Sequence, residues 1–305
     1  MKIITLFLLI HFVLLADIIT PIVDKKSFDK DKVALGKELF FDSSFSKDKK
    51  ISCASCHSDF GSDKRDISIG SDGRKGKIQS LSIFNAVNNY KQFWNGRAKN
   101  LYEQIDGPIH SNFEMNMNKE SIEAYLNSSK NYIKRFKKIY NKKPNYNIFK
   151  DAIVAFEETL LTPNSKFDQF LRGEIILNKK ELKGYKLFQS LGCSTCHNGV
   201  NIGGNSMQLF GNVIKYQYKK GQPDLYDLTK VISDKNVFRV PSLRNVSKTA
   251  PYFHDASANN LEAAVEKMSY HNLGIILSGA QTSAIVSFLK TLNGDIPKTW
   301  IKDAK

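Results

Sequence analysis

Two short cysteine motifs contain the residues of this chain that are best suited to chemistry. Both have the form C-x-x-C-H, one ending at His57 and the other at His197, and together they use every cysteine in the sequence. Thiols at this spacing can form thioether bonds to the two vinyl groups of one haem, and the adjacent histidine can then ligate the iron. The pattern predicts two covalently attached c-type haems. The attachment residues are Cys53, Cys56, Cys193 and Cys196, and the proximal iron ligands are His57 and His197.

Other uses of paired cysteines explain the sequence less well. The two pairs could together form a four-cysteine zinc site, but that site leaves the histidine after each pair unexplained. A thioredoxin-like dithiol would need a βαβ pattern around it, and none is visible. Structural disulfides are the remaining alternative.

The length and charge of the chain limit its class. With 305 residues the chain is long enough for two domains. The formal net charge of +15, before haem carboxylates are counted, suggests an acidic partner or a membrane surface, or simply a solvated lysine-rich surface. The lysines are spread out and no nucleic-acid-binding motif accompanies them, so we expect no nucleic-acid partner.

The first sixteen residues read as a signal peptide. Lys2 supplies the positive start, residues 3–15 are mostly apolar, and Ala16 is a small residue suited to cleavage. The run is short for a membrane span, although Leu14 fits the cleavage pattern poorly and leaves an uncleaved anchor as the alternative. Covalent haem attachment takes place outside the cytoplasm, so we expect a periplasmic protein.

Helical periodicity dominates the rest of the chain, so we expect a mostly α fold. Apolar residues recur at helical spacing in five clear segments: 29–40, 147–161, 178–189, 261–268 and 281–292. Residues 119–140 are expected to form two helices broken near 127–129, and no convincing strand is visible. Pro163 ends the second clear helix, and the domain boundary is predicted there. The predicted parts are a signal peptide at 1–16 and haem domains at 17–165 and 166–305.

A repeated phrase precedes each haem motif. Gly36-Lys-Glu-Leu-Phe40 resembles Gly184-Tyr-Lys-Leu-Phe188, and each is followed by a C-x-x-C-H at a different distance. The repetition indicates that one helix packs against each haem in the same way.

The chemistry of each haem depends on the face opposite its histidine. An iron without a second protein ligand can react with a small molecule, whereas a thioether sulfur there raises the reduction potential and favours electron transfer. The sulfur candidates are Met115, Met117, Met207 and Met268, and spacing does not choose among them. A methionine in such a chain more often fills a core.

Peroxide chemistry would also need an acid–base group that moves a proton between the two peroxide oxygens. Glu114 lies between the apolar residues Phe113 and Met115, a setting that can raise a carboxyl pKa. The alternative is an ordinary surface glutamate. Trp94 could relay electrons between cofactors or simply pack in a core.

Beyond the haem motifs, three longer phrases resemble a known family. The phrases are Phe93-Trp94-Asn95-Gly96-Arg97-Ala98, Gly107-Pro108-Ile109 with Glu114-Met115, and Val240-Pro241-Ser-Leu-Arg244-Asn with Ala250-Pro251-Tyr-Phe-His254-Asp255. The family is the bacterial di-haem cytochrome c peroxidases, which includes the MauG-type protein oxidases, and the resemblance runs from about Val33 to Gly294. It implies two cytochrome-c-like domains, each with one covalently bound haem, and an active site between them.

The resemblance also implies the roles of the cofactors and partners. The His57 haem would reduce hydrogen peroxide to water, and the His197 haem would receive electrons from a small donor protein, a cytochrome c or a cupredoxin. Members of the family are often homodimers, which makes a homodimer an expectation here. The alternatives are a MauG-like protein oxidase and, from another functional class, a plain di-haem electron carrier or peroxide sensor.

Individual residues align with the functional positions of the family. Glu114 aligns with the acid–base residue, Gln104 with its polar companion and Trp94 with the residue between the haems. Met268 aligns with the axial ligand of the electron-transfer haem, and His254 with a histidine near that haem. Because MauG-type proteins have tyrosine at the Met268 position, the methionine favours the peroxidase.

Two positions depart from the family pattern. Ser71 stands where many members have a histidine that blocks the peroxidatic haem until the other haem is reduced, and no histidine lies between His57 and His110. We therefore expect the first haem to be open even in the oxidised protein. The family also often holds one Ca²⁺, and its ligand positions align with Gln79, Thr249 and Pro251. Gln79 stands where the family usually has asparagine, but the glutamine side chain also offers an amide oxygen as a ligand.

Overall fold

The structure, a computed structural model, describes residues 19–23, 27–219 and 221–300. The predicted signal peptide at 1–16 lies outside the described residues. Within them, no helix is both long and apolar enough to cross a membrane.

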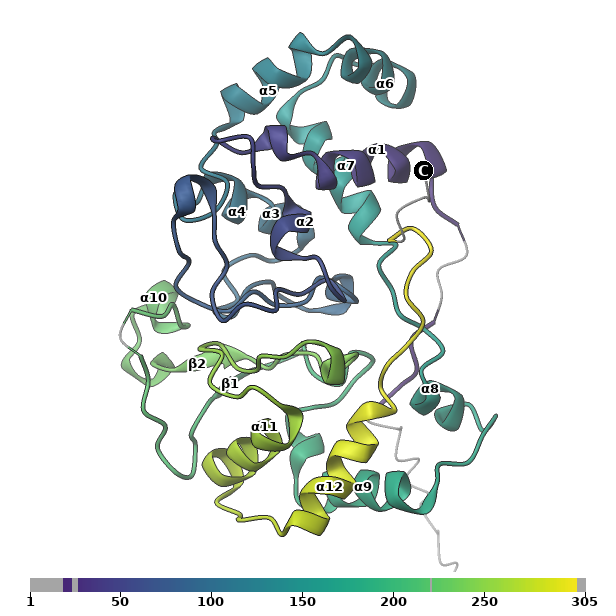
Figure 1. The fold of residues 1–305 in the computed structure, drawn as a ribbon, viewed down its shortest axis with the longest axis vertical. Helices are drawn as coiled ribbons and strands as arrows, with labels where there is room; N and C mark the ends of the chain where they lie inside the picture. Colours follow the sequence, from purple (N-terminus) through teal and green to yellow (C-terminus); the bar gives the residue numbers. More distant parts are fainter. Residues whose placement is uncertain (1–18, 24–26, 220, 301–305) are drawn as a thin grey trace, which may run out of the picture.

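The fold is mostly helical, as predicted, and consists of two stacked halves (Figure 1). The helices of the first half are α1 (Lys30–Phe41), α2 (Cys53–Cys56), α3 (Leu101–Gln104), α4 (Asp106–His110), α5 (Lys119–Ser128), α6 (Lys130–Tyr140) and α7 (Tyr146–Glu157). Those of the second half are α8 (Lys166–Leu171), α9 (Lys179–Ser190), α10 (Tyr226–Thr229), α11 (Leu261–Met268) and α12 (Gly279–Lys290). The predicted break between α5 and α6 is confirmed, because the Ser129 side chain accepts a hydrogen bond from Tyr132 and begins α6.

The second half also contains one short strand pair that the sequence did not predict. Strands β1 (Met207–Leu209) and β2 (Val237–Arg239) pair antiparallel. Three residues are too few to show a period-two pattern, so the expectation of no strand was wrong at this point. The pair lies on the side of the second half that faces the loops of the first half (Figure 1).

The repeated phrase before each haem motif marks the same helix crossing in both halves. Helix α1 packs on α7, and α9 packs on α12. At each crossing a glycine allows the backbones to touch: a Cβ on Gly36 would lie 1.9 Å from the carbonyl oxygen of Ala152, and one on Gly184 would lie 1.9 Å from that of Ala284. The glycines are therefore required by close approach of two helices rather than by a turn.

We expect Gly184→Ala to destabilise the protein by about 1–3 kcal/mol or more, because the added methyl group overlaps the α12 backbone. Gly279→Ala is the matched control, since Gly279 begins α12 and a Cβ there meets no heavy atom within 4 Å. Its alanine should be neutral or stabilising by up to about 1 kcal/mol. Denaturant unfolding of both haem-loaded variants tests this prediction. Equal unfolding midpoints for the two variants would contradict the close contact between α9 and α12 at Gly184.

The first and last described segments of the chain each pack against the opposite half. Near the amino terminus, Ile19 belongs to the core of the second half, and the Ile22 backbone N–H donates to Asp168 at 3.2 Å. Near the carboxyl terminus, Trp300 packs on the first-half core and stacks on Phe156, with ring centroids 6.3 Å apart. Figure 1 shows the yellow chain running from α12 up along the first half. These segments therefore tie the halves together.

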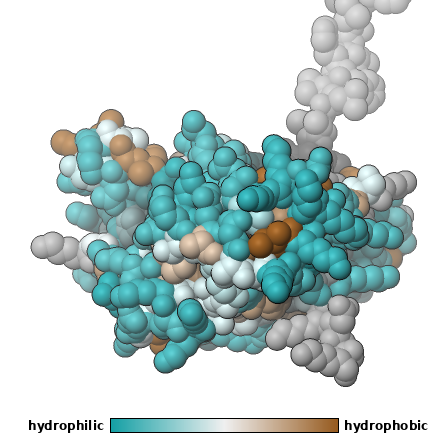
Figure 2. Space-filling model, turned by 90° about the horizontal axis from the view of Figure 1, so that it is seen from above, coloured by the Kyte–Doolittle hydropathy of each residue, from teal (hydrophilic) through white to brown (hydrophobic). Residues whose placement is uncertain are grey.

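The surface above α5 and α6 is mostly hydrophilic. In the view from above, the apolar residues lie in small separate patches (Figure 2). Helix α6 carries five lysines and arginines: Lys130, Lys134, Arg135, Lys137 and Lys138. The basic net charge is therefore carried in part by a solvated helix, as one of the sequence-based alternatives proposed.

Candidate active site

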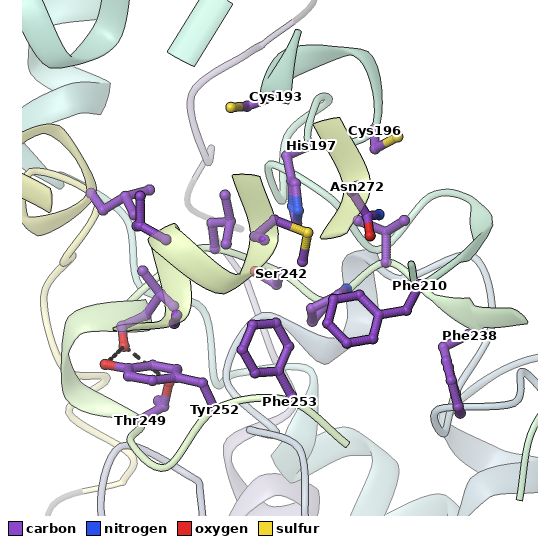
Figure 3. Close-up of a pocket in the computed structure, with 18 of the residues that line it drawn as sticks. Cys193, Cys196, His197, Phe210, Phe238, Ser242, Thr249, Tyr252, Phe253 and Asn272 are labelled. Carbon is purple, nitrogen blue, oxygen red and sulfur yellow. Dashed lines mark hydrogen bonds between the residues drawn. The ribbon is translucent and has the colours of Figure 1, made fainter. Parts of the chain in front are cut away.

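The second C-x-x-C-H motif opens onto a cavity. The motif follows α9 and forms a short 3-10 turn, Cys193–Thr195, which places Cys193, Cys196 and His197 together at one side of the cavity (Figure 3). Apolar side chains line most of the remaining wall: Phe188, Leu243, Leu261, Val265, Ile285 and Leu289. Met268, at the last residue of α11, lines the same cavity. An apolar cleft with two thiols, an imidazole and a thioether fits a c-type haem.

The protonation state of His197 suits an iron ligand. Burial lowers the pKa of its imidazole to about 4, so the ring is neutral at ordinary pH. The Nδ1 atom is buried and has no hydrogen-bond partner among the described residues. A neutral ring in an apolar cavity can give a lone pair to a metal.

The first motif has the same local geometry. Helix α2 carries Cys53 and Cys56, and a reciprocal capping pair of Ser52 and Ser55 begins it. At its end, the Nδ1 atom of His57 donates to the carbonyl oxygen of Gly61 at 3.0 Å. This bond leaves Nε2 without its proton and available to an iron. Burial also lowers the pKa of His57, which keeps the ring neutral.

A longer internal repeat follows each motif and can be traced residue by residue. Residues 82–105 correspond to residues 242–265 at a constant spacing, and in both copies a β-bridge closes the loop before a helix capped by asparagine. The backbone is left-handed at three equivalent pairs: Asn85 and Asn245, Phe93 and Phe253, Gly96 and Ala256. A left-handed backbone is uncommon for phenylalanine, so its occurrence at equivalent positions of the two copies indicates that they follow the same backbone path. The sequence analysis missed this second repeat, although the printed residues contain it.

The repeat shows how the two haem sites differ. Continued at the same spacing, it places Pro108, in α4, opposite Met268, at the end of α11. Proline has no side-chain atom that can ligate iron. At the position where the second half offers a thioether, the first half therefore has a residue that cannot ligate iron, and Glu114 follows in the next loop.

Glu114 is held in a loop that is fixed from two sides. Its backbone N–H donates to Ser111 at 3.1 Å, and its carbonyl oxygen accepts from the Ser71 backbone at 2.7 Å. Burial raises the pKa of the Glu114 carboxyl, while the positive charge of Arg97 and a hydrogen bond from Ser111 oppose the rise. A carboxyl with a raised pKa holds its proton at a higher pH than an ordinary glutamate, which suits acid–base work.

Ser71 has a structural contact of its own. Its side chain is fully buried, and its hydroxyl donates to the carbonyl oxygen of Met115 at 3.0 Å. The preceding residue, Gly70, lies so close to the Glu114 loop that a Cβ would be 2.2 Å from the carbonyl oxygen of Phe113. The Ser71 loop therefore supports the Glu114 loop.

Gln104 ends α3 and is half-buried. In the described part of the chain its side chain makes no hydrogen bond, and none joins it to Glu114. Its predicted role beside Glu114 stays a prediction.

Trp94 joins the two halves. Its indole N–H donates to the carbonyl oxygen of Gln79 at 2.8 Å, and its own carbonyl oxygen accepts from the Arg239 backbone at 2.6 Å. Its ring lies edge-on to His254, with centroids 6.1 Å apart, and lines the same cavity as His197. Trp94 is 8% exposed. It therefore belongs to the buried contact between the two halves.

The residues predicted to bind calcium lie along that contact. Gln79, Thr249 and Pro251 all line the cavity. The Gln79 amide nitrogen donates to the carbonyl oxygen of Asp63 at 3.2 Å, and its backbone N–H donates to that of His254 at 2.9 Å. Among the described residues, no group of three or more His, Cys, Asp or Glu side chains could hold a metal ion. Calcium stays a prediction that rests on amide and carbonyl oxygens.

Besides the Nδ1 of His197, two further buried polar atoms at the cavity have no partner among the described residues. They are the Nη1 of Arg239 and the Nε2 of His254, and both side chains are under 4% exposed. An unpaired buried guanidinium nitrogen is costly, and a haem carboxylate is a chemically suitable partner for it. The sequence analysis named His254 but missed Arg239.

Comparisons with known proteins agree with this geometry. The family model described as di-haem cytochrome c peroxidase matches residues 30–175, and a cytochrome c model matches residues 182–293. Cytochrome c551 peroxidase of Nitrosomonas europaea is 44% identical, covering 92% of this chain and 85% of that protein. The cytochrome c551 peroxidase of Pseudomonas aeruginosa is 41% identical, and the match covers 87% of this chain and 79% of that protein.

Structural comparison gives the same result. A solved MauG-like protein associated with microbial copper homeostasis superposes with a TM-score of 0.81 at 26% identity, covering 90% of this chain and 93% of that one. The same conclusion follows from the two haem motifs, from the internal repeat that aligns Pro108 with Met268, and from these relatives. The chain belongs to the family of di-haem cytochrome c peroxidases and carries two haems c.

Proposed function

We propose that peroxide is reduced to water at the His57 haem, while the His197 haem takes electrons from a small exported cytochrome c or cupredoxin. One observation carries this assignment: the repeat has Pro108 in the first half where the second half has Met268. With the haems bound, Pro108 would offer the first iron no side-chain ligand and Glu114 would serve that haem as the acid–base group, whereas Met268 would offer the second iron a thioether. The haems supply the redox chemistry, and the protein supplies protons, position and insulation from solvent.

Glu114 is the proton carrier in this proposal. As a carboxylate it accepts the proton of the peroxide oxygen nearer the iron, and it returns that proton to the leaving oxygen, which departs as water. The positive charge of Arg97 opposes the rise in the pKa of Glu114 that burial causes, which favours the carboxylate form. Gln104 orients the peroxide, and Trp94 carries electrons between the two sites.

The proposal includes an enzyme that works without prior reduction. The Ser71 hydroxyl is engaged with Met115, and the loop around it is packed on the Glu114 backbone. This supports a first haem whose open face no side chain of the loop blocks.

We expect the fully oxidised protein, as isolated, to oxidise a reduced small cytochrome c on addition of peroxide, with no lag. Turnover that begins only after pre-reduction would leave the peroxidase in place and refute the open first haem. No turnover with several donors in either state would refute the proposed division of roles.

The other functions make different predictions. A MauG-like oxidase would act on a protein substrate, and Met268 in place of tyrosine argues against it. An electron carrier would have both irons six-coordinate, so a high-spin first haem in the oxidised spectrum would exclude it. The proposed protein is periplasmic, is divided into domains at 17–165 and 166–305, and forms a homodimer.

Calcium between the halves is also part of the proposal, with Gln79, Thr249 and Pro251 as protein ligands. Chelation should lower activity, and Ca²⁺ alone should restore it, because the ion would fix the contact on which Trp94 depends. Metal analysis that finds no calcium in fully active protein would refute the site.

A further inference from the structure

An aromatic cluster continues from Trp94 along the wall of the cavity that His197 and Met268 also line. Trp94, Phe210, Tyr216 and Phe238 form one buried group, with Tyr218 packed against it. The ring of His254 lies 6.1 Å from that of Trp94 and 6.3 Å from that of Tyr216, measured between centroids. Tyr216 is therefore reached from Trp94 through one intervening ring.

The cluster reaches the surface through two more rings. The centroid of Tyr216 is 5.0 Å from that of His271, and His271 is 5.1 Å from Tyr270. Tyr270 is 43% exposed, whereas Tyr216 is 9% exposed. A continuous series of ring contacts thus connects the residue between the haem sites with solvent.

Tyr216 is the ring in this series with a base beside it. Its hydroxyl donates to the Asp255 carboxylate at 2.6 Å and lies 2.9 Å from the Ser257 hydroxyl. Burial, together with the Asp255 contact, raises the pKa of Tyr216 to about 12, so the phenol does not ionise by itself. Burial opposes ionisation of Asp255, but hydrogen bonds from Ser257 and Tyr216 lower its pKa, so it is a carboxylate able to take a proton.

The neighbouring Tyr218 lacks such a base. Its ring lies 6.0 Å from that of His254, about as near as Tyr216, but its hydroxyl donates to the backbone carbonyl of Phe210. A carbonyl oxygen is far too weak a base to accept the proton. The two tyrosines therefore share a location and differ in where a phenolic proton can go.

We propose that Tyr216 is a redox-active residue that discharges the enzyme when no donor protein is available. One electron passes from Tyr216 through His254 to the oxidising equivalent that peroxide leaves at the Trp94 contact, and the phenolic proton passes to Asp255. The products are a neutral tyrosyl radical and a carboxylic acid. Tyr270 then gives one electron to the Tyr216 radical and releases its own phenolic proton to solvent, while the proton on Asp255 returns to Tyr216. One oxidising equivalent thereby ends as a neutral tyrosyl radical at the surface.

A nearby positive charge favours loss of the electron and the proton together. The Lys267 ammonium lies 5.6 Å from the Tyr216 ring centroid. It disfavours a cationic ring by repulsion, so loss of the electron alone is opposed. Transfer of the proton to Asp255 in the same step leaves the ring uncharged.

This inference rests on the proposed peroxidase reaction and the role of Trp94 in it, and one experiment distinguishes failure of the inference from failure of the proposed function. Haem-loaded protein is mixed with hydrogen peroxide without donor and freeze-quenched for electron paramagnetic resonance, with ring-deuterated tyrosine to identify tyrosyl signals. Donor turnover is measured in parallel on the same samples. The variants are Tyr216→Phe, Asp255→Asn and, as the matched control, Tyr218→Phe.

We expect a tyrosyl signal in the parent protein and in Tyr218→Phe, its loss in Tyr216→Phe, and its loss or marked delay in Asp255→Asn. Donor turnover should be unchanged in the Tyr216 and Tyr218 variants. A full tyrosyl signal in Tyr216→Phe, or equal loss in Tyr218→Phe, would overturn the inference. Normal turnover with no tyrosyl signal in the parent would overturn it too, whereas absent turnover in the parent would count against the proposed function.

Discussion

Replacing Glu114 with glutamine should lower kcat/KM for peroxide by roughly 10²- to 10⁴-fold, the usual contribution of a positioned acid–base group. Glutamine keeps the size of the side chain and its hydrogen-bonding capacity but cannot carry a proton between the two peroxide oxygens. The loop should stay in place, because the Ser111 and Ser71 bonds that hold it use the Glu114 backbone. Haem content and the oxidised spectrum should therefore match the parent protein.

The pH profile distinguishes this role from a structural one. Burial raises the pKa of Glu114 above its usual range against the opposing charge of Arg97. Parent activity should fall as pH drops through that raised pKa, because the protonated acid cannot accept the peroxide proton. The acid limb should be absent in Glu114→Gln. Glu120→Gln, at the exposed first turn of α5, is the control and should leave rate and profile unchanged. A Glu114→Gln enzyme with a near-normal rate would exclude Glu114 as the proton carrier.

The largest effect on stability is expected for Arg244→Met, which should lower the free energy of unfolding by about 3–5 kcal/mol. The Arg244 guanidinium lies 2.7 Å from the Asp168 carboxylate, and both side chains are fully buried. It also donates to the carbonyl oxygens of Val200 and Thr20, so it connects the loop after the second haem motif, α8 and residues 19–23. Methionine would leave a buried carboxylate without its partner.

Two further variants isolate this effect. Lys166→Met removes a partly exposed partner of Glu181 from the same helix, α8, and should cost only about 0–1 kcal/mol. The double variant Asp168→Leu with Arg244→Met removes both charges and should recover part of the loss. Denaturant unfolding of the haem-loaded proteins measures all three. If Arg244→Met and Lys166→Met have the same midpoint, the buried pair does not contribute as proposed.

Much of this protein is determined locally, and the sequence predicted those parts. A c-type haem site needs two thiols and a histidine at fixed spacing, so Cys53 to His57 and Cys193 to His197 could be identified without a fold. Helix spacing and the repeated glycine phrase likewise depend on neighbours along the chain, and the structure confirms them at α1 and α9. The sequence also contains the repeat that aligns Pro108 with Met268, but a search for short motifs did not reveal it.

The tertiary structure alone decided which distant residues meet. The exchange of Ile19 and Trp300 between the halves, the contact of Trp94 with Gln79 and His254, and the bond from Tyr216 to Asp255 join segments far apart in the chain. No periodicity or spacing encodes such pairs, because they follow from how two cores pack on each other. The same packing leaves the Arg239 guanidinium buried with an unpaired nitrogen, a property that exists only after folding.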